Sequence, residues 1–233
     1  MTGAASPGLR EMLRQGRFAV GRRLRRPVQG RFQPYPHTLP DRYPWLFGFA
    51  RDALQDIAEP RLLSFGCSRG DEVFSLRRYL PGALIKGIDI DPGNIETCTA
   101  RQAREGDERL SFEAGASTLA EPWGSYDAIF CLAVLCHGDL TVTGARRSDP
   151  LMRFEDFART VAAFARCLKP GGLLFLHTTN FRFDDTPTAA AFDVVLQARP
   201  EQMAPDVLFD SSNRLIPGER YYPVGFRKRT AHA

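Results

Sequence analysis

Apolar runs alternate with helical patterns through the middle of the chain. Five apolar runs have the length of β-strands: 61–65, 84–88, 109–112, 127–132 and 172–177. Three stretches with helical periodicity separate several of these runs: 71–80, 92–104 and 154–168. Strands that alternate with helices predict βαβ units, and therefore an α/β fold with a parallel sheet. In such a sheet, a ligand lies at the carboxyl ends of the strands.

The segments on either side of this region are less regular. Residues 27–44 contain five prolines, which hold the backbone extended, so we expect a stiff strap there. A helix follows at about 44–57. In the last third of the chain, we expect a helix at 187–198 and two closing strands at 205–210 and 223–229.

Positive charge is concentrated at the N-terminus. The formal net charge of the chain is +4, but residues 1–31 hold eight arginines and one acid, Glu11, and therefore carry +7. The remainder is slightly acidic, so an enzyme body that binds nucleic acid is not expected. The arginine-rich segment reads either as a solvated extension, or as an arm that contacts a membrane surface or an acidic partner, or as a transit peptide.

Apolar length and cysteine content indicate the compartment. No apolar stretch approaches the roughly 18 residues of a membrane span. The five cysteines are odd in number, lie mostly in apolar surroundings and lack the spacing of metal pairs. We therefore expect buried free thiols, no metal site and a cytoplasmic protein.

The first apolar run breaks into the loop Gly66-Cys67-Ser68-Arg69-Gly70, which has three readings. As G-x-S-x-G, it has the pattern of the nucleophile elbow of an α/β-hydrolase, with Ser68 as the nucleophile. As a degenerate glycine-rich loop, it would hold a dinucleotide. The third reading is a site for S-adenosylmethionine, which contains adenosine but no phosphate.

The hydrolase reading lacks its partners. In that fold the elbow follows several strands, whereas here it ends the first one. A Ser-Asp-His order also needs a late histidine, and only His137, His177 and His232 follow Ser68. His177 lies in an apolar run and His232 lies one residue from the chain end, so we set this reading aside.

Charge argues against the dinucleotide. Its pyrophosphate would lie against the N–H groups at the start of the next helix. That helix begins with Asp71 and Glu72, which complement the helix dipole but are poor neighbours for a phosphate.

The remaining reading, S-adenosylmethionine, fits the residues that follow. Gly66 and Gly70 allow close approach of a ligand to the backbone. Nineteen residues after Gly70, an apolar strand ends at Asp89, which is placed to accept hydrogen bonds from two ribose hydroxyls. We expect the next acid, Asp91, to cap the helix that begins at Pro92.

Residues 61–138 resemble the core of a class I S-adenosylmethionine-dependent methyltransferase. LLSFGCSRG resembles the glycine-rich first motif of this family, GIDID the acidic second motif and RLSFEAGAS the third. YDAIFCLAVLCHG resembles the fourth motif, and LKPGGLLFLHTTN the helix-turn-strand that follows it. The core is also similar to the methyltransferases that esterify glutamates of chemotaxis receptors, although no receptor-recognition domain is found.

The resemblance implies a Rossmann-like, doubly wound, mostly parallel sheet of seven strands with an N-terminal helical or extended lid. We expect three parts: an arginine-rich extension at 1–30, a strap and lid helix at 31–58, and a methyltransferase domain at 59–233. The implied cofactor, S-adenosyl-L-methionine, would be held by ten residues: Gly66, Cys67, Ser68, Gly70, Asp89, Ile90, Ala116, Ser117, Cys131 and Leu132.

This sequence departs from the family pattern at several positions. Ser64 replaces the usual acid of the first strand, and Ser68 replaces the middle glycine of the loop. Ala116, followed by Ser117, stands where the family has an acid that contacts adenine. Leu132 stands where a polar residue often follows the fourth strand. The Ala116 departure leaves a backbone contact for the adenine amino group.

Methyl transfer from a sulfonium is an in-line displacement, so a general base is needed only if the acceptor must lose a proton. His137 is the candidate base. Five further residues are candidates for binding the substrate or closing over it: His37, Arg42, Tyr43, Asn180 and Arg182.

We therefore expect an enzyme that methylates an oxygen or nitrogen atom of a small molecule or sugar-like metabolite. Two alternatives stay open: a methyltransferase of protein carboxylates, and a binding protein that has kept the fold and lost the cofactor.

Overall fold

The computed structural model describes residues 32–34, 38–204 and 207–230. The arginine-rich segment 1–30 and His37 therefore lie outside the described residues. Seven strands form the main sheet: β1 Arg61–Phe65, β2 Leu84–Asp89, β3 Leu110–Ala114, β4 Tyr126–Leu132, β5 Leu168–His177, β6 Phe192–Gln197 and β9 Pro223–Lys228. The main α-helices are α2 Pro44–Ala53, α3 Asp71–Tyr79, α4 Pro92–Glu105, α5 Gly138–Val142 and α6 Phe154–Cys167.

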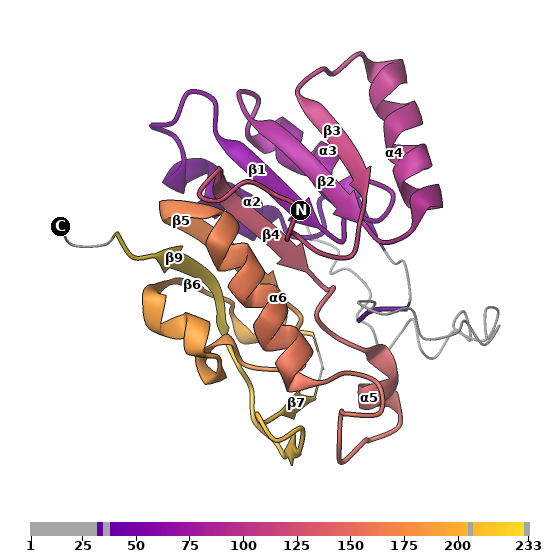
Figure 1. The fold of residues 1–233 in the computed structure, drawn as a ribbon, viewed down its shortest axis with the longest axis vertical. Helices are drawn as coiled ribbons and strands as arrows, with labels where there is room; N and C mark the ends of the chain where they lie inside the picture. The colour runs from indigo at the N-terminus through magenta and orange to yellow at the C-terminus, as the bar shows by residue number, and fades with distance from the viewer. Residues whose placement is uncertain (1–31, 35–37, 205–206, 231–233) are drawn as a thin grey trace, which may run out of the picture.

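The strand order of the sheet is β3-β2-β1-β4-β5-β9-β6 (Figure 1). Strands β1 to β5 are parallel, and β9 runs antiparallel to both of its neighbours. The order reverses direction between β1 and β4, which places a crevice at the carboxyl ends of these two strands. The prediction of an α/β, doubly wound, mostly parallel sheet of seven strands is confirmed.

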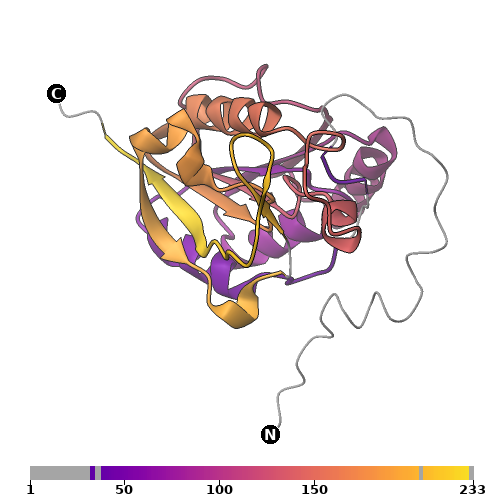
Figure 2. The same ribbon diagram turned by 90° about the horizontal axis from the view of Figure 1, so that it is seen from below.

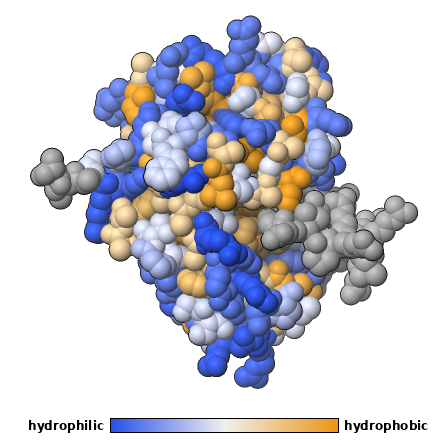
Figure 3. Space-filling view, in the orientation of Figure 1, coloured by the Kyte–Doolittle hydropathy of each residue, from blue (hydrophilic) through white to orange (hydrophobic). Residues whose placement is uncertain are grey.

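Helices cover both faces of the sheet (Figures 1 and 2). The β1 strand shows why, because its successive side chains point to opposite faces. Leu62 packs in the core beneath α2 and α3, whereas Leu63 packs in the core beneath α6. The buried face of α6 consists of residues at helical spacing, such as Phe157, Val161 and Phe164. Hydrophilic residues gather on the outer side of this helix (Figure 3).

The boundaries of the central helices follow local chemistry. The Asp91 side chain accepts a hydrogen bond of 3.0 Å from the Gly93 N–H and caps α4, as predicted. Pro92 occupies the first turn, and Gly106 ends the helix with a φ of +67°.

The last third of the chain differs from the prediction. The expected helix at 187–198 is wrong: Pro187–Ala191 form a 3₁₀-helix, and β6 follows as an edge strand. Its β-branched Val194 and Val195 suit a strand, and β9 supplies its backbone partner. The expected closing strand at 205–210 is reduced to β7 Leu208–Phe209, which pairs with β8 Leu215–Ile216 outside the main sheet. The strand expected at 223–229 is confirmed as β9.

All five cysteines are buried, as predicted. In the part of the chain that the structure describes, no helix is long and apolar enough to cross a bilayer. The same residues contain no group of three or more His, Cys, Asp or Glu arranged to hold a metal ion.

Candidate functional site

A cavity of about 100 Å³ lies where the carboxyl ends of β1, β2 and β4 meet the N-terminal strap. Loops that follow β1 to β4 contribute to the lining, and so do residues 32–34, 38–39 and 42–43 of the strap. This is the edge of the sheet at which the strand and helix pattern predicts a ligand. The residues used below lie among its lining: Gly66, Cys67, Ser68, Glu72, Asp89, Ile90, Asn94, Ala116, Leu132, Ala133, Arg42 and Tyr43.

The loop after β1 turns sharply away from the sheet. Gly66 has a φ of +75°, and an added Cβ would lie 2.4 Å from the Val134 side chain, so only glycine fits there. The Gly66 and Cys67 N–H groups both donate to the Ile88 carbonyl, at 2.7 and 3.0 Å, and tie the loop to β2. The Ser68 hydroxyl is buried and has no hydrogen-bond partner among the described residues. A ligand in the cavity can supply that partner.

Gly70 and Cys67 allow this loop to pack closely on the elements next to it. Gly70 has a φ of +87°, is the N-cap of α3 and lies outside the cavity lining. The Cys67 side chain lies against β2, where an added Cβ on Gly87 would be 2.9 Å from its Sγ. Small residues at these positions therefore let the loop pack closely on the neighbouring strand.

Asp89 ends β2 at the cavity and is 7% exposed. Its Oδ2 accepts a 2.8 Å hydrogen bond from the Ser68 N–H. Its Oδ1 accepts from the Asp91 N–H at 2.9 Å and from Asn94 Nδ2 at 3.0 Å. Each carboxylate oxygen has two lone pairs, so Oδ2 keeps one acceptor site for a ligand.

Ile90, Gly115 and Ala116 extend this end of the cavity. The Gly115 N–H donates to the Asp89 carbonyl at 2.9 Å, which joins the ends of β2 and β3. Ser117 lies outside the cavity lining, where its hydroxyl accepts a 3.0 Å hydrogen bond from the Leu119 N–H. The structure therefore brings Ile90 and Ala116 beside Asp89 and places the Ser117 hydroxyl in a local turn.

Glu72 is a cavity residue that the sequence reasoning missed. It lies in the first turn of α3, where it was interpreted only as a complement to the helix dipole. Its carboxyl accepts a 2.7 Å hydrogen bond from the Ser64 hydroxyl, and burial raises its pKa to about 7. The Ser64 hydrogen bond and the nearby Arg42 act in the opposite direction. The missed signal is the pairing of a serine at the usual acid position of β1 with an acid eight residues later.

The end of β4 forms the wall between the loop and the strap. Leu132 and Ala133 line the cavity, whereas Cys131 is fully buried beneath it. Ala133 has a φ of +58°, and its N–H donates to the His177 carbonyl at 2.8 Å. This hydrogen bond joins the carboxyl ends of β4 and β5.

The strap contributes Arg42 and Tyr43 to the cavity and is anchored to α3. The Asp41 N–H donates to the Ser75 hydroxyl at 3.0 Å, and the Asp41 carboxylate pairs with Arg78 at 2.8 Å. The Arg42 guanidinium lies 5.1 Å from the centre of the Tyr43 ring. A cation and an aromatic side chain therefore face the loops of the sheet.

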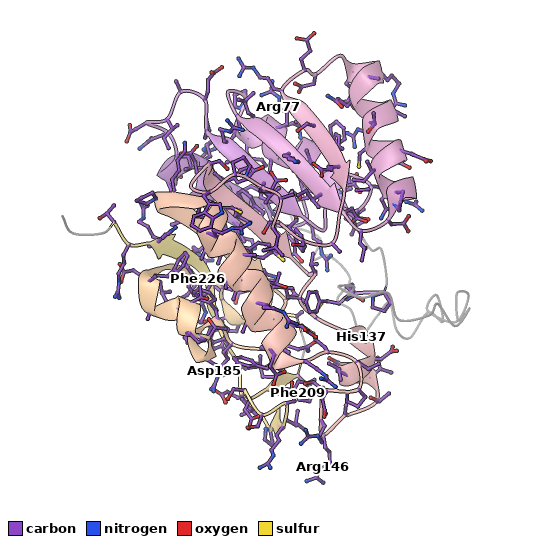
Figure 4. The ribbon with its side chains drawn as sticks, viewed as in Figure 1. Arg77, His137, Arg146, Asp185, Phe209 and Phe226 are labelled. Carbon is purple, nitrogen blue, oxygen red and sulfur yellow. The ribbon has the colours of Figure 1, made fainter. Side chains whose placement is uncertain are left out.

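His137 lies at the start of α5 (Figure 4). Its Nδ1 accepts a 3.3 Å hydrogen bond from the Asp139 N–H, so this side chain caps the helix. Burial lowers the pKa of His137, and the nearby Asp139 carboxylate opposes this shift. The structure places His137 outside the cavity lining.

The side chain of Asn180 connects distant segments of the chain by hydrogen bonds. It is fully buried, and its Oδ1 accepts a 2.7 Å hydrogen bond from the His137 N–H. Its Nδ2 donates to the Val207 carbonyl at 2.8 Å. Asn180 therefore joins three segments beyond the strand ends and lies outside the cavity lining.

Arg182 is engaged in ion pairs. It forms a two-point contact with Asp185, at 2.9 and 3.0 Å, and a 2.5 Å contact with Glu219. These acids raise the pKa of Arg182 further. The structure places this guanidinium away from the cavity lining, between the 3₁₀-turn at Phe183–Asp185 and the segment before β9.

Residues 63–176 match a protein-family model described as a methyltransferase domain. A ubiquinone biosynthesis O-methyltransferase of Saccharophagus degradans is 27% identical over 193 residues, which are 82% of this chain and 70% of that protein. A protein of the same name from Xanthomonas oryzae pv. oryzae is 31% identical over 142 residues, which are 60% of this chain and 50% of that protein. An uncharacterized protein of Synechococcus is 30% identical over 136 residues, and the match spans 29% of it.

Among solved structures, the YcgJ protein of Bacillus subtilis has a similar fold. The TM-score is 0.50 at 15% sequence identity, and the match covers 81% of this chain and all of that one. This likeness concerns the fold alone.

Proposed function

We propose that this chain, whose residues 63–176 belong to the family of class I S-adenosylmethionine-dependent methyltransferases, transfers a methyl group to an oxygen or nitrogen atom of a small-molecule acceptor. The cofactor would lie in the cavity at the carboxyl ends of β1 and β2. One observation carries the proposal. The lining brings Asp89, Glu72 and Arg42 to one cavity, and these groups suit the ribose and the zwitterionic amino-acid part of S-adenosylmethionine.

The nucleoside end of the cofactor fits the region around Asp89. The remaining acceptor site on Asp89 Oδ2 suits a ribose hydroxyl, and Ile90 and Ala116 form the adjoining wall. Acidic residues outnumber basic ones along the lining, which includes Asp89, Asp91 and Glu72. This charge suits a ligand without phosphate.

The amino-acid end of the cofactor fits Glu72 and Arg42. The Glu72 carboxylate would hold the ammonium group, in place of the acid that Ser64 replaces on β1. Arg42 lies close enough to Glu72 to lower its pKa, so opposite charges lie together at this end. A zwitterionic group can pair with both charges.

S-adenosylmethionine supplies an activated methyl group on a sulfonium, so the protein has to align the acceptor and exclude water. Alignment alone is worth on the order of 7–11 kcal/mol in favourable cases. We propose that the strap acts as the lid, since it contributes a wall of the cavity and is anchored to α3 through Asp41.

The acceptor would lie between the strap and the tip of β4. The strap wall is largely apolar there, with Phe32, Pro34 and Leu39 beside Tyr43. This composition suits a small molecule with an apolar body. The curated relatives named O-methyltransferases support oxygen as the accepting atom.

The test is transfer of an isotope-labelled methyl group from S-adenosylmethionine to a panel of small alcohols, phenols, amines and carboxylic acids. We expect labelled product from at least one hydroxyl or amine, and a large loss of transfer in Glu72→Gln. The matched control, Glu96→Gln, changes an exposed acid on α4 and should retain transfer. Label that enters only carboxylic acids would instead favour the methylation of carboxylates.

A binding protein without the cofactor is the second candidate. It is favoured by the three hydrogen bonds that Asp89 already accepts from the protein and by Ala116 in place of the usual acid. The two candidates are distinguished by calorimetry with S-adenosylmethionine, since only the methyltransferase binds it.

A further inference from the structure

Two buried thiols lie in contact beside the loop that follows β1. Cys67 belongs to this loop and lines the cavity, whereas Cys98 is fully buried on the inner face of α4. The two thiols are hydrogen-bonded to each other. Both also contact the carbonyl oxygen of Ser68, Cys67 Sγ at 3.8 Å and Cys98 Sγ at 3.3 Å. The loop and the helix are therefore joined through one pair of sulfur atoms.

Close packing holds these sulfur atoms in place. An added Cβ on Gly87 would lie 2.9 Å from Cys67 Sγ, and an added Cβ on Gly70 would lie 3.0 Å from Cys98 Sγ. A disulfide requires its sulfur atoms to approach to about 2.05 Å. Two thiols that are already in hydrogen-bond contact can form such a bond while the loop and the helix stay folded.

One thiol of the pair ionises more readily than the other. The hydrogen bond from Cys67 lowers the pKa of Cys98, and the positive charge of Arg101 acts in the same direction, whereas burial and the nearby Asp89 oppose this shift. The same hydrogen bond, together with burial, raises the pKa of Cys67. The thiolate is the form that attacks an oxidant, so Cys98 reacts first.

The sulfur atoms are connected to the groups that would bind the cofactor. Ser68, whose carbonyl receives both thiols, has a φ of +50° and donates its N–H to Asp89 at 2.8 Å. On α4, Asn94 lies one turn before Cys98 and donates to the same carboxylate at 3.0 Å. A rearrangement of the sulfur pair therefore acts on Ser68 and Asp89 from two elements.

We propose that Cys67 and Cys98 form a reversible disulfide when a peroxide oxidises them, and that this bond weakens the binding of S-adenosylmethionine to the cavity. The second part rests on the proposed function. Bond formation removes both thiol hydrogens, so the Ser68 carbonyl loses these two donors. A buried carbonyl that loses its donors is costly, which favours a rearranged loop over the one in which the Ser68 N–H meets Asp89.

The oxidation is a two-electron step that one molecule of hydrogen peroxide balances. The Cys98 thiolate attacks one peroxide oxygen, the O–O bond breaks and hydroxide leaves, which gives a sulfenic acid on Cys98. The Cys67 sulfur then attacks the Cys98 sulfur, the S–S bond forms and the sulfenic oxygen leaves as hydroxide. The two thiol protons convert both hydroxides to water, so the sulfurs are oxidised and the peroxide is reduced. A dithiol reverses the reaction by exchange.

Oxidation and cofactor binding should oppose each other. Hydrogen peroxide is small enough to enter the cavity that Cys67 lines, and a bound cofactor would cover the same lining. The coupling is reciprocal, so a cofactor that prefers the dithiol form also makes the disulfide easier to reduce. A tenfold difference in affinity between the two forms corresponds to a rise of about 30 mV in the reduction potential of the pair at saturating cofactor.

The test treats the full chain with hydrogen peroxide, maps disulfides by mass spectrometry of its peptides, and measures the affinity for S-adenosylmethionine by calorimetry. We expect a Cys67–Cys98 bond and an affinity that is about tenfold weaker after oxidation. Dithiothreitol should restore the affinity. S-adenosylmethionine that is present during the treatment should slow formation of the bond.

Two serine variants separate this pair from the other thiols. Cys98→Ser keeps a donor for the Ser68 carbonyl but cannot form the bond, so its affinity should not respond to peroxide. The matched control is Cys167→Ser. Cys167 is a buried thiol on α6 that likewise contacts a backbone carbonyl, that of Thr118 at 3.4 Å, and it lies outside the cavity lining. This variant should remain as sensitive to peroxide as the unchanged protein.

Two results would overturn the inference while the proposed function stands. In the first, the peptides of the oxidised protein contain no Cys67–Cys98 bond. In the second, the bond forms and the affinity stays the same. If the reduced protein binds no S-adenosylmethionine at millimolar concentration, the proposed function fails, and the effect that we assign to the disulfide fails with it.

Discussion

At the end of β2, the carboxylate of Asp89 accepts three hydrogen bonds from the protein, whereas Glu72, in the first turn of α3, accepts one from Ser64. Both acids line the same cavity. The Asp89 end is therefore built largely by the chain itself. The Glu72 carboxyl, which has the single partner Ser64 among the described residues, is less fully paired within the chain.

The number of hydrogen bonds that an acid accepts within the protein indicates whether it mainly stabilises the fold or mainly binds a ligand. A group whose hydrogen bonds are made within the protein contributes mainly to the folded state, since its partners are left unsatisfied when it is removed. A group held underpaired at a cavity is costly in the free protein and gains most when the ligand arrives. The cavity should thus divide into an end that stabilises the fold and an end that binds.

The largest effect is expected from Asp89→Ala. This change leaves the Ser68 N–H, the Asp91 N–H and Asn94 Nδ2 without their acceptor, so the free energy of unfolding should fall by about 3 kcal/mol. Denaturant titration measures this loss. Asp91→Ala is the control and removes the helix cap of α4, at about 1 kcal/mol. Equal losses in the two variants would contradict the comparison.

Glu72→Gln should have its main effect on the cofactor. Replacing the charged partner of the ammonium group should cost about 2 kcal/mol of binding, which is roughly a 30-fold weaker affinity for S-adenosylmethionine. Calorimetry at pH 8 measures it. The same variant should be at least as stable as the unchanged protein at this pH, because it removes a buried charge. A large loss of stability with unchanged affinity would mean that Glu72, like Asp89, mainly stabilises the folded state.

The pH dependence of stability should show Glu72 and His177 acting in opposite directions. The pKa of Glu72 is raised from 4.5 to about 7, so in this window the folded chain holds a proton that the unfolded chain has lost. The contribution of Glu72 to stability therefore falls as the pH rises through the window. The pKa of His177 is lowered from 6.5 to about 4, so its contribution rises between these values and is complete above pH 6.5.

Glu72→Gln removes one of the two opposing effects. Between pH 4.5 and 6.5, stability of the variant should rise with pH more steeply than that of the unchanged protein, by up to about 1.4 kcal/mol per pH unit. Denaturant titrations across this range measure the two slopes. Parallel slopes would mean that the Glu72 carboxyl titrates alike in the folded and unfolded chains.

The smallest effect is expected from Ala116→Asp, which restores the family acid at the nucleoside end. A carboxylate there can accept a hydrogen bond from the adenine amino group, so the affinity for S-adenosylmethionine should rise about fivefold, or roughly 1 kcal/mol. Ala116→Ser is the control of similar size. Weaker binding in the aspartate variant would show that the adenine lies elsewhere.

The part of the fold that follows local signals was predictable. The apolar runs at β1, β2 and β4, the glycine loop and the Asp91 cap are short-range patterns, and the structure has them at the expected positions. The last third depends on pairing between distant strands. Nothing local in 192–197 indicates that β9 will lie beside it, and the helix expected at 187–198 is wrong there.

The site divides in the same way. Asp89 was predictable because an acid at a strand end has a fixed position relative to the loop of the preceding strand. Glu72 was missed because an acid in a first helical turn already has a local explanation. Its position at the cavity becomes visible only when the fold brings Ser64 and the strap to the same region. Asn180 is the opposite case. The sequence predicted a substrate-binding residue after a strand, whereas the structure shows a buried side chain that bonds to other segments of the protein.

Binding of S-adenosylmethionine at the carboxyl ends of β1 and β2 is best tested by calorimetric titration of this ligand into the full chain, with Glu72→Gln measured in parallel. We expect one site with a dissociation constant below 1 mM, as an order of magnitude of about 10–100 μM, in the unchanged protein, and roughly 30-fold weaker binding in the variant. Absence of heat at millimolar ligand, or equal affinities in the two proteins, would contradict this expectation.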